Sequence, residues 1–233
     1  MRKYFVFCFL AWLRLIAKTF WRVRQAWVGP VPDDPWRGLR LVCFLHHTRL
    51  FEWLFIGAVP LRFIWRVAAH GVVPAAEKTI RRPLVGLFFK AIAAHVVSIT
   101  RERDHTWRSV LSRIDPDSMV IILPEGRMMR PGGLDADGRP MTVRGGISDI
   151  LDAIPGGPML IAYSGGLHHV QAPGEHLPRL FRTIDLNIEW LDLGAYRDEI
   201  RARSGSDAAF KRSVVVDLES RRDRHRPGAA SGP

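Results

Sequence analysis

The chain has 233 residues, enough for one α/β domain with a substantial core and too few for two such domains. Lysine and arginine number 34 against 23 aspartate and glutamate, so the formal net charge is +11. This excess implies an anionic partner, either nucleic acid or a phospholipid surface. The sequence has no helix-turn-helix, RNA-binding signature or zinc-ligand spacing. We therefore expect an anionic membrane surface as the partner, and no nucleic acid.

The cysteines and most histidines predict no disulfide framework, metal or cofactor. Cys8 and Cys43 both lie in apolar runs, and this usage fits a reducing compartment. Five histidines have no other ligand at metal-binding spacing, so we expect structural or surface positions for them: His70, His95, His105, His168 and His169.

The first 29 residues predict an amphipathic helix at a membrane interface. Tyr4 to Leu13 is an unbroken apolar and aromatic run, about half the length of a bilayer span. No small-residue cleavage site follows it, which argues against a signal peptide. On a helical wheel, an arc of about 80° holds Arg14, Lys18, Arg22 and Gln25. Amphipathic rings suited to headgroup depth are supplied by Trp12, Trp21 and Trp27. The alternative is a core-covering helix with a solvated basic edge.

A proline-rich break at residues 29–35 ends this N-terminal segment. We therefore divide the chain into a membrane-associating helix at 1–29, a main domain at 36–219 and a tail at 220–233. The tail combines four arginines with glycine, alanine, serine and proline, so we expect it to be disordered.

Five apolar runs in the main domain predict strands. They are Leu39 to Leu45, Leu61 to Ala68, His95 to Thr100, Ser118 to Leu123 and Pro158 to Tyr163. The segments between them are mostly long enough for helices. This alternation predicts an α/β fold with a mostly parallel central sheet flanked by helices.

Polar residues follow four of these runs, and ligands of open α/β sheets bind beyond the carboxyl ends of strands. The residues are His46 and His47, then Arg101, then Glu125 and Arg127, then residues 164–166. Their convergence predicts a site. Residues 127–146 are polar, glycine-rich and too broken for regular structure, so we expect an active-site loop there.

A catalytic dyad is suggested by His47 and Glu52. A histidine can take a proton from a hydroxyl when a carboxylate fixes its tautomer and offsets the imidazolium charge. On one continuous helix, residues five apart point about 140° apart, so the pair requires a bend. The sequence supplies one: a strand through Leu45, a turn at 46–49 and an apolar helix from Leu50.

Each motif also has an ordinary structural explanation. A histidine and a glutamate at this spacing occur by chance in many chains. Pro124-Glu125-Gly126 can be a turn in which glycine supplies a positive φ, with Glu125 the N-terminal acid of a helix. Arg101 opens a charge run that extends to Asp104 and is typical of a solvated surface. The order and spacing of the motifs together favour the functional interpretation.

With His47, Arg101 and Pro124-Glu125-Gly126 in this order, residues 38–170 resemble the glycerolipid acyltransferases, the superfamily of lysophosphatidic acid acyltransferases. The family's first block is a histidine followed by an acid after four residues, usually aspartate, although some lipid A acyltransferase relatives have glutamate. Ile99–Arg101 resembles the family's second block, Pro124–Arg127 its third, and the strand from Pro158 its fourth. Between its last two blocks the family has a basic residue followed by glycine, and Arg144 with the glycines after it resembles this element.

The resemblance implies an acyltransferase that uses acyl-CoA or acyl carrier protein as co-substrate and needs no cofactor. His47 would be the general base, oriented by Glu52, and the default acceptor would be the lysophospholipid 1-acyl-glycerol-3-phosphate. The acceptor site would comprise Arg101, Glu125, Gly126, Arg127 and Arg144. Guanidinium groups match phosphate oxygens, which suits this role. The enzyme would act at the cytoplasmic face of the inner or plasma membrane.

Three departures from the family pattern concern this site. Glutamate replaces the commoner aspartate at Glu52, His46 replaces asparagine, and Arg127 replaces threonine. They leave two alternatives: an acyltransferase for another lipid acceptor, and a peripheral lipid-binding protein that has lost catalysis. A lipid hydrolase is disfavoured because the sequence has no Gly-x-Ser-x-Gly elbow.

Overall fold

The computed structural model describes residues 1–46, 48, 51–100, 104–130, 133–135, 137–165, 167–171 and 177–228. Two predicted site residues, His47 and Arg101, lie outside the described residues.

The centre of the fold is a seven-stranded sheet in the order β1-β7-β6-β2-β5-β3-β4. The strands are β1 (Arg22–Val28), β2 (Leu41–Leu45), β3 (Gly71–Ala76), β4 (His95–Ile99), β5 (Met119–Ile122), β6 (Pro158–Ser164) and β7 (Thr183–Asp192). From β6 to β4 every neighbouring pair is parallel, whereas β7 is antiparallel to β6 and parallel to the edge strand β1. The predicted α/β fold with a mostly parallel sheet is therefore confirmed.

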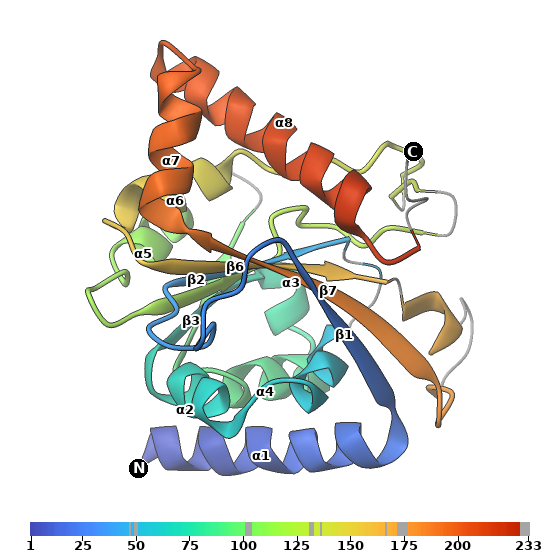
Figure 1. Cartoon of the computed structure of the whole chain (residues 1–233). Helices are drawn as coiled ribbons and strands as arrows, with labels where there is room; N and C mark the ends of the chain where they lie inside the picture. The colour runs from blue at the N-terminus through green and yellow to red at the C-terminus, as the bar shows by residue number, and fades with distance from the viewer. Residues whose placement is uncertain are drawn as a thin grey trace.

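Helices cover both faces of the sheet (Figure 1). One face carries α1 (Arg2–Phe20), η1 (Glu52–Gly57), α2 (Leu61–His70) and α4 (Pro83–Ala91). The other carries α5 (His105–Leu111), α6 (Gly146–Ala153), α7 (Leu193–Ala202) and α8 (Asp207–His225). The short elements α3 (Glu77–Ile80) and η2 (Leu167–His169) lie in connections. Each layer buries its own apolar cluster against the sheet, as a two-sided α/β fold requires.

The run from Leu61 to Ala68 is a helix, α2, so the strand prediction there is wrong. Its buried residues fall at helical spacing: Phe63, Ile64, Val67 and Ala68. Arg62 and Trp65 lie on the exposed side. A short apolar run fits a buried strand and a buried helix equally well, and here the 3.6-residue period decides.

The N-terminal helix is present but ends at Phe20, nine residues before the predicted boundary at 29. Trp21 adopts an extended conformation, and the chain continues as β1. The predicted polar arc is therefore wrong, because Arg22 and Gln25 lie in a strand that pairs with β7. Alternating exposure along β1 shows the period of two that distinguishes a strand from a helix.

Among the described residues, no helix is long and apolar enough to cross a membrane.

The segment at 220–233 is helical at its start, because α8 extends through His225. The prediction of disorder is therefore wrong for residues 220–225. One stripe of α8 is buried at spacings of four residues: Phe210, Val214, Leu218 and Arg222. This stripe packs against α6, α7 and the sheet, so tertiary contacts hold the arginine-rich end in a helix.

Candidate active site

The carboxyl ends of the parallel strands form one edge of the sheet, where β2 lies between β5 and β6. His46 follows β2, Ser164 ends β6, and Glu125 comes three residues after Ile122 of β5. Because Cys43 pairs with both Ile122 and Ile161, the loops after these three strands are neighbours. The predicted convergence of polar residues is therefore found for these three strands.

The loop after β2 is tied to the loop after β6 by two hydrogen bonds. His46 Nδ1 lies 2.7 Å from the carbonyl oxygen of Ser164, so this nitrogen carries the proton that it donates. The backbone N–H of Leu167 donates to the hydroxyl of buried Thr48 at 2.8 Å. These bonds fix the backbone on both sides of position 47.

His46 has a φ of 63°, in the left-handed region that non-glycine residues rarely adopt. Strain of this kind persists where the surroundings enforce it, and it clusters at functional sites. The ring's hydrogen bond to Ser164 supplies that enforcement. The sequence marked His46 as one of the polar residues that follow a strand and as a departure from a family pattern, and the structure adds a role in shaping the turn.

Glu52 is the first residue of η1, beyond the bend. Its Oε1 accepts a hydrogen bond at 3.1 Å from the backbone N–H of Thr48, the residue directly after position 47. The bend required for a His47–Glu52 pair is thus present, and the carboxylate reaches back across it. A carboxylate placed there can orient and charge-balance an imidazole at position 47.

Glu125 is buried and paired with an arginine of α8. It is 1% exposed, and Oε1 lies 3.0 Å from Nη1 of Arg222, which is also buried. Arg222 Nη1 additionally donates to the carbonyl oxygen of Met141 at 3.2 Å. One guanidinium therefore joins the start of the loop after β5 to the irregular segment just before α6. Sequence reasoning missed Arg222, although the four-residue spacing of the buried positions on α8 was a readable signal.

A second buried polar network holds α8 to the sheet. Arg221 binds Glu189 of β7 at 2.5 Å and Asp217 at 2.7 Å. The Tyr163 hydroxyl donates to Glu189, and burial together with that carboxylate raises the pKa of Tyr163. The phenol therefore stays protonated and keeps donating. This network places α8, and with it Arg222, at a fixed position over the loop after β5.

Arg127 forms an ion pair with Asp135, and Asp137 lies 3.8 Å away. Asp135 also accepts hydrogen bonds from the backbone of Asp137 and Arg139. The Arg139 N–H and then the Arg127 guanidinium lower the pKa of Asp135 to about 2. The charge of Arg127 is therefore largely offset within residues 127–146, and its guanidinium orders that loop.

Gly126 and Arg144 lie together. Gly126 has a φ of 61°, confirming the glycine turn after β5. A side-chain β-carbon at Gly126 would meet Arg144 Cγ at 3.8 Å, and the Arg144 N–H donates to the carbonyl oxygen of Pro124 at 2.8 Å. Among the described residues between β5 and α6 there is no helix or strand, only an isolated bridge between Leu134 and Pro140. The irregular loop was correctly predicted there.

The described residues on either side of Arg101, Thr100 and Asp104, are joined by a hydrogen bond. Thr100, just after β4, donates through its hydroxyl to Asp104 at 2.8 Å, and Asp104 caps α5 by accepting from the Thr106 N–H. The Thr106 and Thr100 hydroxyls help to lower the pKa of Asp104 to about 2. The edge strand β4 lies three positions from β2, about 14 Å at normal strand spacing.

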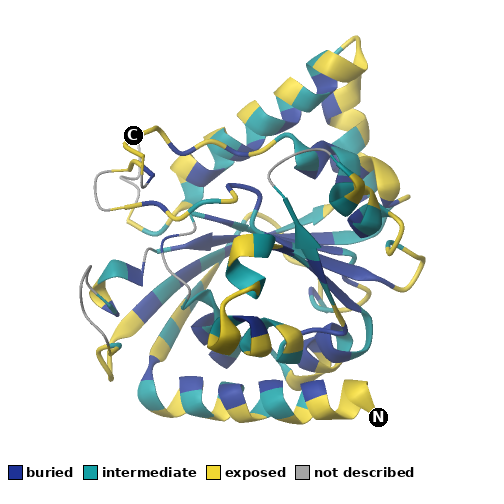
Figure 2. Cartoon of the chain, turned by 180° about the vertical axis from the view of Figure 1, so that it is seen from behind, coloured by how far each residue is buried: buried dark blue, intermediate teal, exposed yellow. Residues whose placement is uncertain are grey.

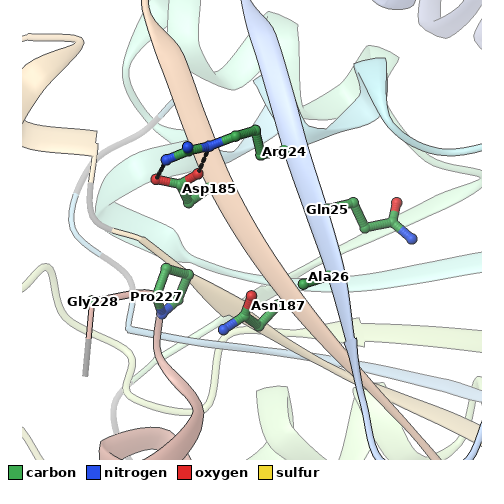
Figure 3. Close-up of a pocket in the computed structure, with 7 residues that line it drawn as sticks. All are labelled: Arg24, Gln25, Ala26, Asp185, Asn187, Pro227 and Gly228. Carbon is green, nitrogen blue, oxygen red and sulfur yellow. Dashed lines mark hydrogen bonds and ion pairs between the residues drawn. The ribbon is translucent and has the colours of Figure 1, made fainter. Parts of the chain in front are cut away.

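A surface recess of about 370 Å³ lies beside β1 and β7 (Figure 3). It is lined by Arg24, Gln25, Ala26, Asp185, Asn187, Pro227 and Gly228. Arg24 and Asp185 pair with each other at 2.6 Å, and Asn187 donates to the carbonyl oxygen of His225. None of the described site candidates lines this recess.

No group of three or more histidine, cysteine or acidic side chains in the described parts of the chain is placed to hold a metal.

No protein-family model and no curated protein sequence matches the chain. Among solved structures, it is similar to the crystal structure of PlsC from Thermotoga maritima, a 1-acyl-sn-glycerophosphate (LPA) acyltransferase. The similarity covers 91% of this chain and 80% of that one, with a TM-score of 0.52 and 19% sequence identity. The fold is PlsC-like. The resemblance in residues 38–170 is thus matched by a PlsC-like arrangement over nearly the whole chain.

Proposed function

We propose that the protein is an acyltransferase that moves a fatty acyl group from acyl-CoA or acyl carrier protein to the hydroxyl of a lysophospholipid. The default acceptor is 1-acyl-glycerol-3-phosphate, as in the activity named for the PlsC of similar fold. The observation that carries the proposal is the loop after β2, where Glu52 reaches back across a bend to the residue after His47. The loop with Glu125 and Gly126 lies beside it, at the sheet edge where ligands bind.

In the proposed reaction His47 removes the proton from the acceptor hydroxyl as its oxygen attacks the thioester carbonyl. Glu52 orients the imidazole and offsets its positive charge. The tetrahedral intermediate collapses with cleavage of the carbon–sulfur bond, and the thiolate takes the proton back from the imidazolium. The products are an ester and a thiol, so the protein needs no covalent intermediate, metal or redox cofactor.

We assign the acceptor phosphate to Arg101 and Arg144. Arg101 follows β4, and Arg144 lies beside Gly126. Guanidinium groups match phosphate oxygens in geometry and charge. Glu125 contributes by holding the loop through Arg222, and Gly126 exposes backbone where the acceptor approaches. The anionic cytoplasmic face of a membrane is the proposed location, because a lysophospholipid acceptor resides there and the protein is cationic.

Acyl transfer itself is the test. Labelled acyl-CoA and labelled acyl carrier protein are each incubated with the protein and a panel of lysophospholipids on anionic vesicles. We expect transfer to a phosphate-bearing acceptor. If no acceptor is acylated while the protein still binds vesicles, the lipid-binding alternative is supported in place of the enzyme.

Acceptor choice is expected to depend on Arg127. In Arg127→Thr, the pairing with Asp135 is lost and the residue usual in the family is restored. We expect the ratio of kcat/KM between a lysophospholipid with a larger anionic headgroup and 1-acyl-glycerol-3-phosphate to shift by about tenfold, the size of one charged contact. Arg139→Thr, a change in the same loop, is the control. An unchanged ratio in Arg127→Thr would count against a role in specificity.

A further inference from the structure

The outward face of α1 is apolar, although it is open to solvent. The inner face buries Val6, Leu10, Leu13 and Ala17. The opposite stripe carries Phe5, Cys8, Trp12 and Leu15, at alternating spacings of three and four. Trp12 is 55% exposed and Leu15 65%. A helix that is apolar on both sides needs a second apolar surface against its outer side, because an ordinary surface helix is polar there.

The apolar area continues from α1 onto α4. Phe9 contacts Phe88 with ring centroids 6.2 Å apart, and Arg2 donates to the carbonyl oxygen of Lys90, so the two helices lie side by side. On α4, Leu84 is 84% exposed and Leu87 is 67% exposed. Figure 1 shows α4 between the sheet and α1, and Figure 2 shows the N-terminal helix with its buried, dark blue residues on the side that faces the rest of the fold.

Phe181 extends the same area at the other end of α1. Phe181 is 73% exposed, its ring contacts that of Phe20, the last residue of α1, and its N–H donates to the Phe20 carbonyl oxygen. Phe181 also has a φ of 58°, a costly conformation for an aromatic residue. The backbone thus holds a large apolar side chain mostly in solvent, where it gains little burial in the isolated molecule.

Cations surround this area and acids are almost absent from it. Residues 1–32 and 78–101 contain no aspartate or glutamate. Exposed basic residues border the apolar side chains: Arg2, Lys3, Lys18, Lys78, Arg82 and Lys90. The acidic residue in α3 and α4 is Glu77, and its carboxylate forms an ion pair with Arg81. Apolar insertion flanked by cations is the pattern that binds anionic bilayers, whereas a second cationic copy would be repelled.

We propose that the outer stripe of α1, the leucines of α4 and Phe181 form one docking face for an anionic phospholipid bilayer. α1 lies flat on the bilayer, and Leu84, Leu87 and Phe181 insert beside it. This deepens the proposed function and rests on it, because it fixes the side from which a lipid acceptor arrives. The face is next to the candidate site, because Phe88 of α4 contacts Trp53, the neighbour of Glu52, with ring centroids 6.4 Å apart.

Vesicle binding tests the docking face without any acyl donor. Wild type, the double variant Leu84→Ser/Leu87→Ser and Phe181→Ser are sedimented with vesicles of phosphatidylglycerol and phosphatidylcholine, and with phosphatidylcholine alone. We expect binding to the anionic vesicles that weakens with added salt. The double variant is expected to lose about tenfold in partition coefficient and Phe181→Ser about fivefold, from the apolar area withdrawn. Val216→Ser removes an apolar residue of similar exposure from α8 and is expected to bind as wild type.

The results separate the alternatives. The substituted side chains are exposed, so thermal unfolding is expected to match wild type in all variants. Binding by the double variant equal to that of Val216→Ser would overturn the proposal. So would a wild-type dimer that dissociates in the double variant and does not bind vesicles, because the face would then join two copies. Absence of acyl transfer with normal vesicle binding overturns the proposed reaction and leaves the docking face intact.

Discussion

Arg222→Met is expected to destabilise the protein by about 3–5 kcal/mol. Arg222 and Glu125 are both buried, and their ion pair joins α8 to the loop after β5. Methionine preserves most of the side-chain volume, so the loss arises mainly from removing the cation that faces a buried carboxylate. The measurement is the free energy of unfolding in urea, with Arg224→Met as the control, since Arg224 is exposed on the same helix.

A double-mutant cycle isolates the pair. Glu125→Gln in the Arg222→Met background removes the carboxylate charge, so the double variant is expected to be more stable than the sum of the single effects predicts. Because Arg222 also bonds the carbonyl oxygen of Met141, part of the cost remains in the double variant. If Arg222→Met unfolds at the same urea concentration as Arg224→Met, the pair does not hold the loop.

Glu52→Gln is expected to lower kcat for acyl transfer by about 10²–10⁴-fold with little change in vesicle binding. Glutamine keeps an oxygen that accepts from the Thr48 N–H, so the bend is preserved and only the charge is lost. The imidazole at position 47 then has no carboxylate beyond the bend to balance the positive charge that develops during proton transfer. Steady-state kinetics on anionic vesicles measure the effect.

Two further variants make this test specific. Glu52→Asp keeps the charge on a shorter side chain and is expected to retain more activity than Glu52→Gln. Glu77→Gln removes a surface carboxylate that pairs with Arg81 and is expected to leave kcat unchanged. Equal kcat values for Glu52→Gln and wild type would remove Glu52 from the mechanism.

Four of the seven strands and the position of the loops after them were predictable from local sequence. Buried parallel strands are continuous apolar runs, which β2 and β6 display. β7 was missed although its sequence alternates, with Ile184, Leu186 and Ile188 buried on one face. β1 was read as helix because its tryptophan and arginines also fit an interfacial wheel, and only pairing with β7 decides between the two.

The motifs of the site were predictable from the sequence, but the contacts between its residues were not. The bend before Glu52 and the glycine turn at Gly126 follow from local patterns, and both are present. The spacing of the buried positions on α8 could have marked Arg222 as buried, but its pairing with Glu125 joins residues 97 positions apart, and local sequence does not show which partner it has. The same holds for the bond between His46 and Ser164, which spans 118 positions.

The most direct test of the proposed site compares wild type and His47→Ala in acyl transfer to lysophospholipids on anionic vesicles, with vesicle binding measured in parallel. We expect His47→Ala to lose at least about 10²-fold in transfer and to bind vesicles as wild type does. Transfer by His47→Ala at the wild-type rate would contradict the assignment of His47 as the general base and, with it, the proposed site.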